Sequence, residues 1–200
     1  MQDHKKIAVF FDRDGVLVAL NEYNRDKNLE FITRKEDLEL LPGAVEAVIL
    51  LNKRGIEIII VTNQPQVARG LIDEKAVQNI NKEFEEMLKR KGAKIDASYY
   101  CPHHPSAGTS SYTIKCACRK PLPGMLLQAA KEHDIDLKNS FIIGDRISDI
   151  KAGQLAGCKS IGVKTGYACN DGFADATPDY MADDVLSAVN YILERIISTN

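Results

Sequence analysis

Short runs rich in apolar residues alternate with longer amphipathic stretches along this chain of 200 residues. The short runs are typical of strands buried in a sheet. They predict strands at 7–11, 56–61, 97–101, 140–144 and 159–163. Apolar residues at helical spacing predict helices at 42–54, 73–91, 123–133, 148–156 and 183–197. This alternation indicates an α/β fold with a doubly wound parallel sheet. We find no internal repeat and no linker, so we expect one domain over residues 1–200.

Three connecting stretches are less regular. Residues 16–18 are Val-Leu-Val and predict a further short strand, while residues 36–41 fit one helical turn. Residues 102–122 are rich in Pro, Gly, Ser and Thr and form a long connection without predicted secondary structure. A connection of that length inside a domain needs something to hold it in place.

Composition excludes several classes of protein. Hydrophobic residues make up 44% and charged residues 27%, which is ordinary for a soluble globular chain. The formal charge of −2 gives no sign of a surface that binds nucleic acid. No apolar stretch approaches the roughly 18 residues that span a bilayer, and the first apolar run is too short for a signal peptide. We therefore expect a cytoplasmic protein with no membrane partner, whose five cysteines are free thiols or metal ligands rather than disulfides.

Polar side chains follow three of the predicted strands at their C-terminal ends. They are Asp12 and Asp14, Thr62 and Asn63, and Asp145 and Asp149. The carboxyl ends of parallel strands meet at one edge of a sheet, where ligands bind. Carboxylates held together repel one another unless a cation joins them, and oxygen ligands at this density suit Mg²⁺. The simpler alternatives are a polar turn after the first strand and, for Asp149, a helix cap.

The long connection carries a second candidate metal site. Cys101, His103, Cys116 and Cys118 have the spacing C-x-H-x12-C-x-C, in which two close ligand pairs bracket a loop. Thiolate and imidazole ligands favour Zn²⁺, and four protein ligands make such a zinc structural. His104 is left out because Cys101 and His103 repeat the spacing of the second pair. The alternative is a metal-free loop with reduced cysteines.

Four short motifs occur in an order that resembles the haloacid dehalogenase-like (HAD-like) phosphatases. They are Asp-Arg-Asp-Gly at 12–15, Thr-Asn at 62–63, Arg-Lys-Pro at 119–121 and Gly-Asp-x-x-x-Asp at 144–149. The resemblance implies that Asp12 attacks phosphorus and forms an aspartyl phosphate. It also implies that Asp14 protonates the leaving alcohol and then activates the water that hydrolyses the intermediate.

The same resemblance implies the groups that bind metal and phosphate. Mg²⁺ would be held by the Asp12 and Asp145 side chains and the backbone carbonyl of Asp14. Thr62 would bind a phosphoryl oxygen with Asn63 beside it, and Lys120 would supply positive charge in the transition state. Catalysis is thus assigned to Asp12, Asp14, Thr62 and Lys120.

The loop at 101–118 and the residues near it indicate a smaller group within the HAD-like phosphatases. Cys-Pro-His-His-Pro, Cys-x-Cys-Arg-Lys-Pro and Ala-Arg-Gly at 68–70 resemble the D-glycero-D-manno-heptose 1,7-bisphosphate phosphatases, and histidinol phosphatase domains share the same loop. The first of these families implies an enzyme of carbohydrate metabolism that removes the C7 phosphate of a sugar bisphosphate, and we expect a monomer. The chain departs from it at Val16–Val18, at Pro65-Gln66 and in the length of residues 20–41.

The gaps between the motifs are too short for a large cap domain, so we expect an open site with the loop as one wall. Arg69 and Arg119 are candidates for binding the far end of the substrate, because Arg suits bidentate phosphate recognition. For Arg69 a surface role over apolar neighbours is the alternative. The remaining functional alternatives are a histidinol-phosphate phosphatase, a nucleic-acid 3′-phosphatase and a catalytically silent, zinc-stapled interaction module.

Overall fold

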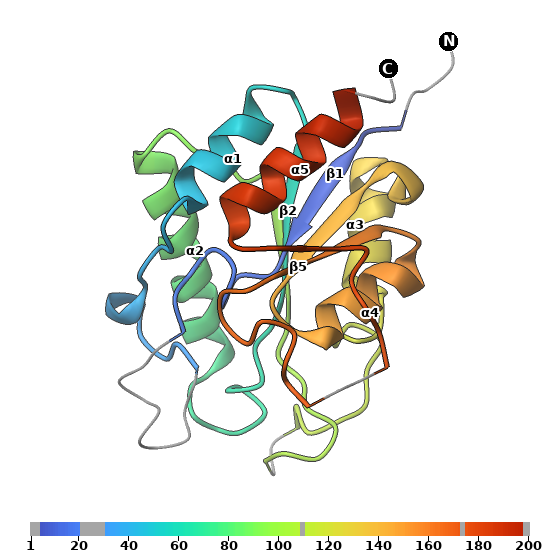
Figure 1. The fold of residues 1–200 in the computed structure, drawn as a ribbon. Coiled ribbons are helices and arrows are strands. Elements are labelled where there is room, and N and C mark those ends of the chain that lie inside the picture. The colour runs from blue at the N-terminus through green and yellow to red at the C-terminus, as the bar shows by residue number, and fades with distance from the viewer. Residues whose placement is uncertain (1–4, 21–30, 109–110, 173–174, 198–200) are drawn as a thin grey trace.

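The strands form one parallel sheet in a computed structural model that describes residues 5–20, 31–108, 111–172 and 175–197 (Figure 1). Over these ranges the sheet has six strands in the order β3-β2-β1-β4-β5-β6. They are β1 (Ala8–Phe11), β2 (Glu57–Asn63), β3 (Ala97–Cys101), β4 (Phe141–Gly144), β5 (Lys159–Val163) and β6 (Tyr180–Ala182). The order reverses between β1 and β4, and sheets of this kind bind ligands at that point, outside the carboxyl ends of the strands.

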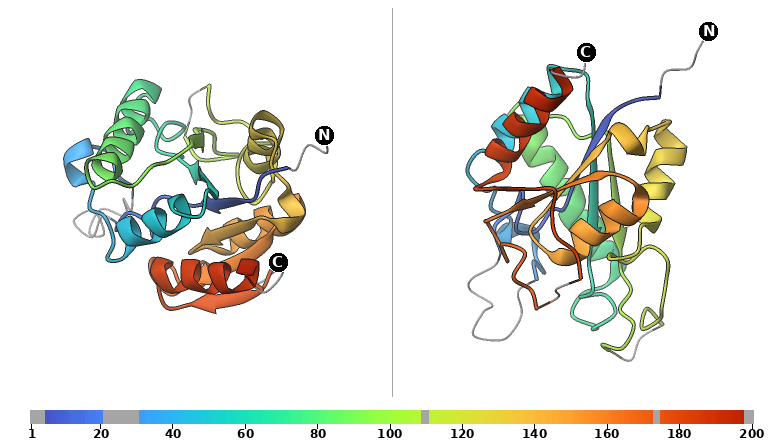
Figure 2. Two further views of the ribbon diagram at one scale, coloured as in Figure 1. Left: turned by 90° about the horizontal axis from the view of Figure 1, so that it is seen from above. Right: turned by 45° about the vertical axis from the view of Figure 1, so that its right-hand side comes forward.

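Helices cover both faces of the sheet (Figure 2). They are α1 (Ala44–Asn52), α2 (Glu74–Arg90), α3 (Gly124–His133), α4 (Ile147–Ala156) and α5 (Val185–Ile197), with short 3₁₀ turns η2 (Lys35–Asp37) and η3 (Leu137–Asn139). Buried residues of α1, α2 and α5 share one core with the sheet, and those of α3 and α4 share the other. The predicted doubly wound fold is confirmed.

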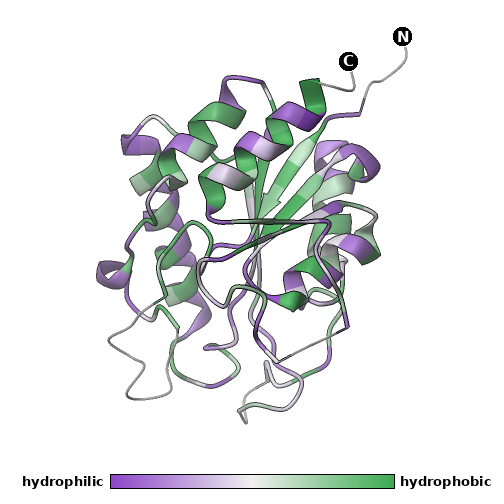
Figure 3. Cartoon of the chain, in the orientation of Figure 1, coloured by the Kyte–Doolittle hydropathy of each residue, from purple (hydrophilic) through white to green (hydrophobic). Residues whose placement is uncertain are grey.

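The central strands divide their side chains between these two cores. Val9 and Phe11 of β1 face the core under α1 and α5, while Ala8 and Phe10 face the core under α3. Successive side chains of a strand point to opposite faces, so a strand buried on both sides is apolar throughout. Figure 3 shows these strands as hydrophobic, with polar residues on the outer helix faces and loops.

The structure differs from the sequence prediction at several places. Residues 16–18 do not form a strand: Gly15 has φ +87°, and its N–H donates to the Val18 carbonyl at 2.7 Å, which closes a turn. Their side chains are apolar because they are fully buried. Of the helical turn expected at 36–41, only residues 36–37 are helical, as part of η2, and β2 extends through Thr62 and Asn63 rather than ending before them. Strand β6 was not predicted.

The described part of residues 20–41 supplies Phe31 to the pocket described below and Ile32 to the core. Residues 21–30, which account for most of the unusual length of that stretch, lie outside the described ranges. No helix within the described residues has the length and apolar character needed to cross a membrane.

Candidate active site

The acidic residues predicted at the strand ends come together at the switch point between β1 and β4. Asp12 follows β1 directly, and its N–H donates to the Ile143 carbonyl of β4 at 3.0 Å. Side-chain oxygens of Asp12, Asp145 and Asp149 all lie within 4.8 Å of one another, and all three residues are buried. The strand geometry therefore gathers three carboxylates where the loops leave the sheet.

This cluster has the donor set and the unsatisfied atom that a cation would need. Oδ2 of Asp145 accepts the Tyr167 N–H at 2.9 Å, whereas its buried Oδ1 has no hydrogen-bond partner in the part of the chain that the structure describes. Burial, with the charges of Asp149 and Asp12, raises the pKa of Asp145 well above its ordinary value. Burial also raises the pKa of Asp12 to about 6, against the opposing effect of Lys120. An oxygen-seeking cation such as Mg²⁺ fits this arrangement.

Backbone, rather than side chains, forms the wall behind Asp145. A methyl group on Gly15 would lie 2.2 Å from Asp145 Oδ2, and one on Gly166 would lie 2.1 Å from the same oxygen. Both glycines have positive φ, at +87° and +61°, so a side chain there would meet backbone strain as well as a clash. Only glycine lets these two turns approach the carboxylate.

Lys120 lies against the same carboxylates. Its side chain is 1% exposed, and Nζ lies 3.1 Å from Asp12 Oδ1 and 2.6 Å from Asp149 Oδ1. Nζ also donates to the Val61 carbonyl at 2.7 Å. Burial alone would lower the pKa of Lys120, but the two carboxylates raise it, so the ammonium stays charged.

Asn63 orients Lys120 through the backbone. Its side-chain amide donates to the Lys120 carbonyl and accepts the Lys120 N–H, both at 3.1 Å. The neighbouring Thr62 is buried and its Oγ1 accepts a hydrogen bond from Gln64 at 2.9 Å. The strand-end residues thus hold the site together, and both also line the adjoining pocket.

The pocket beside the carboxylates has a volume of about 510 Å³ and a wall of basic side chains. Arg69, Arg119 and Arg146 line it, together with Asp12, Asp14, Thr62 and Lys120. The Arg69 guanidinium lies over the Phe31 ring at 5.2 Å, and that of Arg146 lies over the Tyr167 ring at 3.6 Å. Arg119 Nη1 donates to the His103 carbonyl at 3.1 Å. Three arginines lining one pocket with these acidic residues fit a ligand with more than one phosphate.

His104 also lines this pocket, a role that the sequence did not indicate. Its Nδ1 accepts the backbone N–H groups of Ser106 and Ala107, at 3.2 and 2.8 Å. Burial and the charges of Arg119 and Arg69 lower its pKa, so the ring is neutral near pH 7 and carries its proton on Nε2. It is therefore a hydrogen-bond donor rather than a metal ligand.

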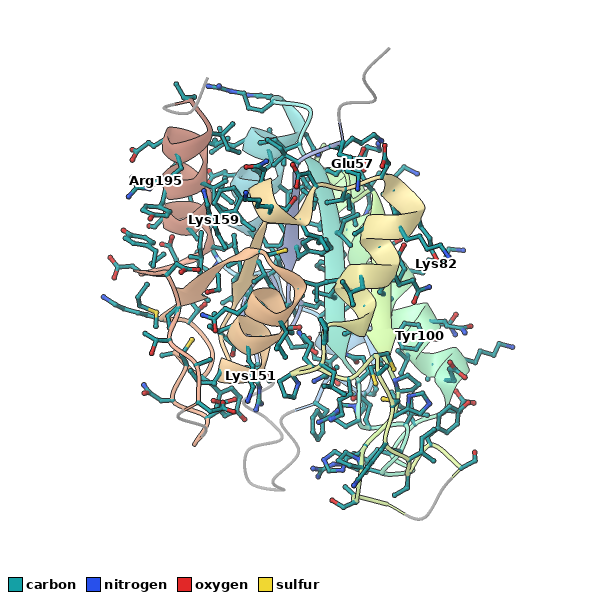
Figure 4. All side chains as sticks on the ribbon, turned by 90° about the vertical axis from the view of Figure 1, so that its right-hand side faces the viewer. Glu57, Lys82, Tyr100, Lys151, Lys159 and Arg195 are labelled. Carbon is teal, nitrogen blue, oxygen red and sulfur yellow. The ribbon has the colours of Figure 1, made fainter. Side chains whose placement is uncertain are left out.

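The four predicted zinc ligands meet at the end of β3. Cys101, the last residue of β3, has its Sγ 3.5 Å from that of Cys116 and 3.2 Å from that of Cys118. His103 Nδ1 lies 3.4 Å from the Cys118 sulfur, and Figure 4 shows sulfur atoms gathered near the labelled Tyr100. With Zn–S bonds of about 2.3 Å, the sulfurs of a tetrahedral site lie about 3.8 Å apart. The cluster could therefore close around a metal ion with small adjustments, and His104 is not part of it.

Asp149 and Arg146 are the other site residues that the sequence did not assign. Asp149 was expected to be a helix cap or part of the acidic set, and it is both: Oδ2 accepts the Arg146 N–H at 3.0 Å while Oδ1 pairs with Lys120. Its place in the motif Gly-Asp-x-x-x-Asp was a signal for this pairing. Arg146 follows Asp145 at the start of α4, and only its position next to the motif pointed to it.

Sequence comparison gives relatives that cover most of the chain. A D-glycero-beta-D-manno-heptose-1,7-bisphosphate 7-phosphatase from Photorhabdus laumondii is 41% identical over 165 residues, 82% of this chain and 83% of the relative. The chain belongs to the heptose-bisphosphate 7-phosphatase family. Within this family, a D-glycero-alpha-D-manno-heptose-1,7-bisphosphate 7-phosphatase of the same organism is 37% identical and covers 86% of the chain and 90% of its own length.

A family model and a solved structure also match this chain. A HAD-hydrolase-like family model matches residues 117–188. The D,D-heptose 1,7-bisphosphate phosphatase from B. bronchiseptica, solved as a complex with magnesium and phosphate, has a TM-score of 0.78 and 30% identity. The match covers 95% of this chain and 99% of that protein. The resemblance seen in the sequence motifs is confirmed.

Proposed function

We propose that this chain is a Mg²⁺-dependent phosphatase that removes the C7 phosphate of D-glycero-D-manno-heptose 1,7-bisphosphate through an aspartyl phosphate on Asp12. The observation that carries the proposal is the buried Asp12–Lys120–Asp149 arrangement beside Asp145, open to a pocket lined by three arginines. The relatives named above are heptose-1,7-bisphosphate 7-phosphatases and supply the choice of sugar.

In this proposal Asp12 is the nucleophile. A bond forms between its carboxylate oxygen and phosphorus as the bond from phosphorus to the sugar oxygen breaks. Lys120, fixed 3.1 Å from Asp12, supplies positive charge that does not have to reorganise as negative charge shifts during transfer. The Thr62 hydroxyl lies in the pocket wall and would donate to a phosphoryl oxygen.

Asp14 is the proposed acid and base. Its protonated carboxyl group gives its proton to the departing sugar oxygen, and the resulting carboxylate takes a proton from the water that attacks the aspartyl phosphate. That water releases inorganic phosphate and restores Asp12. The Asp14 side chain is 18% exposed and lines the pocket, so a substrate can reach it.

Two metals complete the proposal. Mg²⁺ would be held by the Asp12 and Asp145 carboxylates and the Asp14 carbonyl, and when bound it neutralises charge between the nucleophile and the phosphate. A structural Zn²⁺ would be held by Cys101, His103, Cys116 and Cys118. Because Arg119 and Lys120 directly follow Cys118, closing that loop would fix both cations beside the pocket.

The pocket supports a substrate with two phosphates. One phosphate would lie against Asp12 and Lys120, and the other would reach Arg69, Arg119 or Arg146 at the far wall. Arg119 is better suited than Arg69 to a fixed contact, because it is half-buried and bound to the His103 carbonyl, while Arg69 is exposed. His104 would donate to a sugar hydroxyl or to the second phosphate.

Phosphate release from a small panel of esters tests the substrate. The panel contains both anomers of heptose 1,7-bisphosphate, fructose 1,6-bisphosphate, histidinol phosphate and a 3′-phosphorylated oligonucleotide, each with Mg²⁺. We expect the highest kcat/KM with one heptose anomer, because the distal phosphate adds contacts to the arginines. Preference for histidinol phosphate would contradict the sugar assignment but not the chemistry. Release from no ester by metal-loaded protein would favour a silent module.

Removal of Mg²⁺ should stop turnover and its return should restore it. We expect EDTA treatment to abolish phosphate release and added Mg²⁺ to restore it. Added Mg²⁺ should also raise the melting temperature, because a bound cation would give Asp145 Oδ1 a partner and offset the repulsion among the three carboxylates. Zinc content, measured in the same samples, must remain unchanged for the effect to be assigned to Mg²⁺. Full activity after chelation would contradict the role of the acidic cluster.

A further inference from the structure

Arg13 is a charged side chain that the proposed chemistry does not yet use. It stands between Asp12 and Asp14 after β1, and it is fully buried, at 0% exposure. Nε donates to Asp14 Oδ1 at 2.9 Å and Nη2 donates to Asp14 Oδ2 at 2.8 Å, so both carboxylate oxygens are bound. This is the bidentate geometry that a planar guanidinium gives to a carboxylate.

Residues from two other elements hold the guanidinium in turn. Arg13 Nη1 donates a hydrogen bond to Oδ1 of Asn81 in α2 at 2.5 Å, and Nη2 donates one to Oε1 of Gln64, which follows β2, at 3.0 Å. Asn81 is also buried and has no place in the pocket lining. It contacts the proposed acid only through Arg13, among the hydrogen bonds of the described residues.

Gln64 ties this network to the phosphate side of the site. Its Nε2 donates to Asp14 Oδ2 at 3.0 Å and to Thr62 Oγ1 at 2.9 Å. Gln66 Nε2 donates to Gln64 Oε1 at 2.5 Å, which fixes the orientation of the Gln64 amide. Gln64 therefore fixes the position of the Asp14 carboxyl group relative to the Thr62 hydroxyl.

Fold stability is a weak reason to bury this charge. Taking a guanidinium out of water is costly, and buried ion pairs often stabilise a fold no better than apolar residues of similar size. The network instead fixes one group, the carboxyl of Asp14, a residue that lines the pocket and has an 18% exposed side chain. A general acid must lie within hydrogen-bond reach of the leaving oxygen, and a misplacement of about 1 Å can cost about 100-fold in rate.

We propose that Arg13 is a positioning residue for Asp14 and that Asn81 anchors it from α2. This inference rests on the proposed function, since it assigns the acid step to Asp14. The network holds the Asp14 carboxyl at the pocket so that its proton reaches the departing oxygen as the phosphorus–oxygen bond breaks. Loss of the anchor then weakens the acid step and leaves the nucleophile and phosphate contacts in place.

Two phosphate esters separate this role from a structural one. An alkoxide leaving group needs the proton of an acid, whereas 4-nitrophenolate is stable enough to leave without it. The ratio kcat/KM reports steps up to the formation of the aspartyl phosphate, so it excludes the later hydrolysis in which Asp14 acts as base. The comparison is therefore kcat/KM for heptose 1,7-bisphosphate against kcat/KM for 4-nitrophenyl phosphate, with Mg²⁺ present.

We expect Asn81→Ala to lower kcat/KM for the sugar substrate by about 10- to 100-fold and that for 4-nitrophenyl phosphate by less than about threefold. Asn79→Ala is the matched control, because Asn79 lies on the same helix and is exposed. It should change neither value. Equal losses on both esters after Asn81→Ala would overturn the inference, because a loosened fold affects both substrates alike.

A second pair of variants covers the case in which Asn81→Ala folds poorly. Arg13→Lys keeps the charge but loses the bidentate contact, and it should show the same selective loss. In an Asp14→Asn background, Arg13→Lys should lower kcat/KM for the sugar no further, because a positioning residue acts only through the group it positions. Additive losses would overturn the inference. Absence of activity on both esters in the wild-type protein would instead contradict the proposed function itself.

Discussion

Asp12→Asn is expected to lower phosphate release by about 10⁴-fold or more, the scale on which hydrolases lose activity without their nucleophile. The amide has nearly the shape of the carboxylate but cannot attack phosphorus as an anion. Lys120 keeps its contacts with Asp149 and the Val61 carbonyl, so the local arrangement should survive. The measurement is steady-state phosphate release from the preferred panel substrate at saturating Mg²⁺.

The control for this substitution is the same chemical change at the opposite end of the sheet. Asp134 follows α3 with φ 55° and is exposed, and its carbonyl accepts the Lys6 N–H just before β1. Asn tolerates this left-handed conformation, so Asp134→Asn should keep full activity. Circular dichroism of both variants should match the wild type. Activity near wild type in folded Asp12→Asn protein would remove Asp12 from the nucleophile role.

Cys116→Ser is expected to reduce zinc from about one ion per chain and to lower thermal stability. The metal would close a loop between Cys101 and Cys118, and closing a loop of similar length with a disulfide contributes about 3 kcal/mol. For a chain of this size such a loss lowers the melting temperature by roughly 6 to 12 °C. Activity should fall too, because the loop carries Arg119 and Lys120 at its end. Elemental analysis and thermal unfolding give the first two values.

Cys169→Ser is the matched control for the loss of a thiol. Cys169 is partly buried near Gly162 and lies outside the cluster of four ligands. The variant should retain the zinc content of the wild type, whatever its effect on the neighbouring turn. A stable wild-type protein without zinc, or equal zinc in both cysteine variants, would contradict the structural zinc.

The strands and helices with strong local signals were predictable from sequence, and the weak or non-local elements were not. Helix α2 has an Asp73 cap, which accepts the Ala76 N–H at 2.7 Å, and an apolar face, so its limits followed from local rules. Strand β6 has only three residues at the sheet edge and is held by pairing with β5, which no local pattern reports. Residues 16–18 carried the pattern of a strand because all three are fully buried, although only Val18 pairs, in isolated bridges to Asp14 and Leu40.

The candidate site divides in a similar way. Residues at strand ends can be grouped from the sequence alone, because parallel topology brings those ends together. The hydrogen-bond partners of those residues cannot be predicted from the sequence in this way. Arg13 and Asn81 look like an ordinary turn residue and an ordinary helix residue, and only their contact through space reveals the network. Asn63 was expected beside the phosphate, and its bonds to the Lys120 backbone could not be inferred from the motif.

The wall formed by Gly15 and Gly166 has a consequence for engineering this protein. Since that side of the site is built from backbone pressed against Asp145, it offers no side chain to exchange and no room to add one. The neighbouring pocket is lined in part by Phe31, Arg69 and His104, which come from separate connecting segments. Libraries aimed at new substrates should therefore vary these three pocket residues. Substitutions at these positions can change substrate selectivity and leave the residues proposed for phosphate transfer, Asp12, Asp14 and Lys120, unchanged.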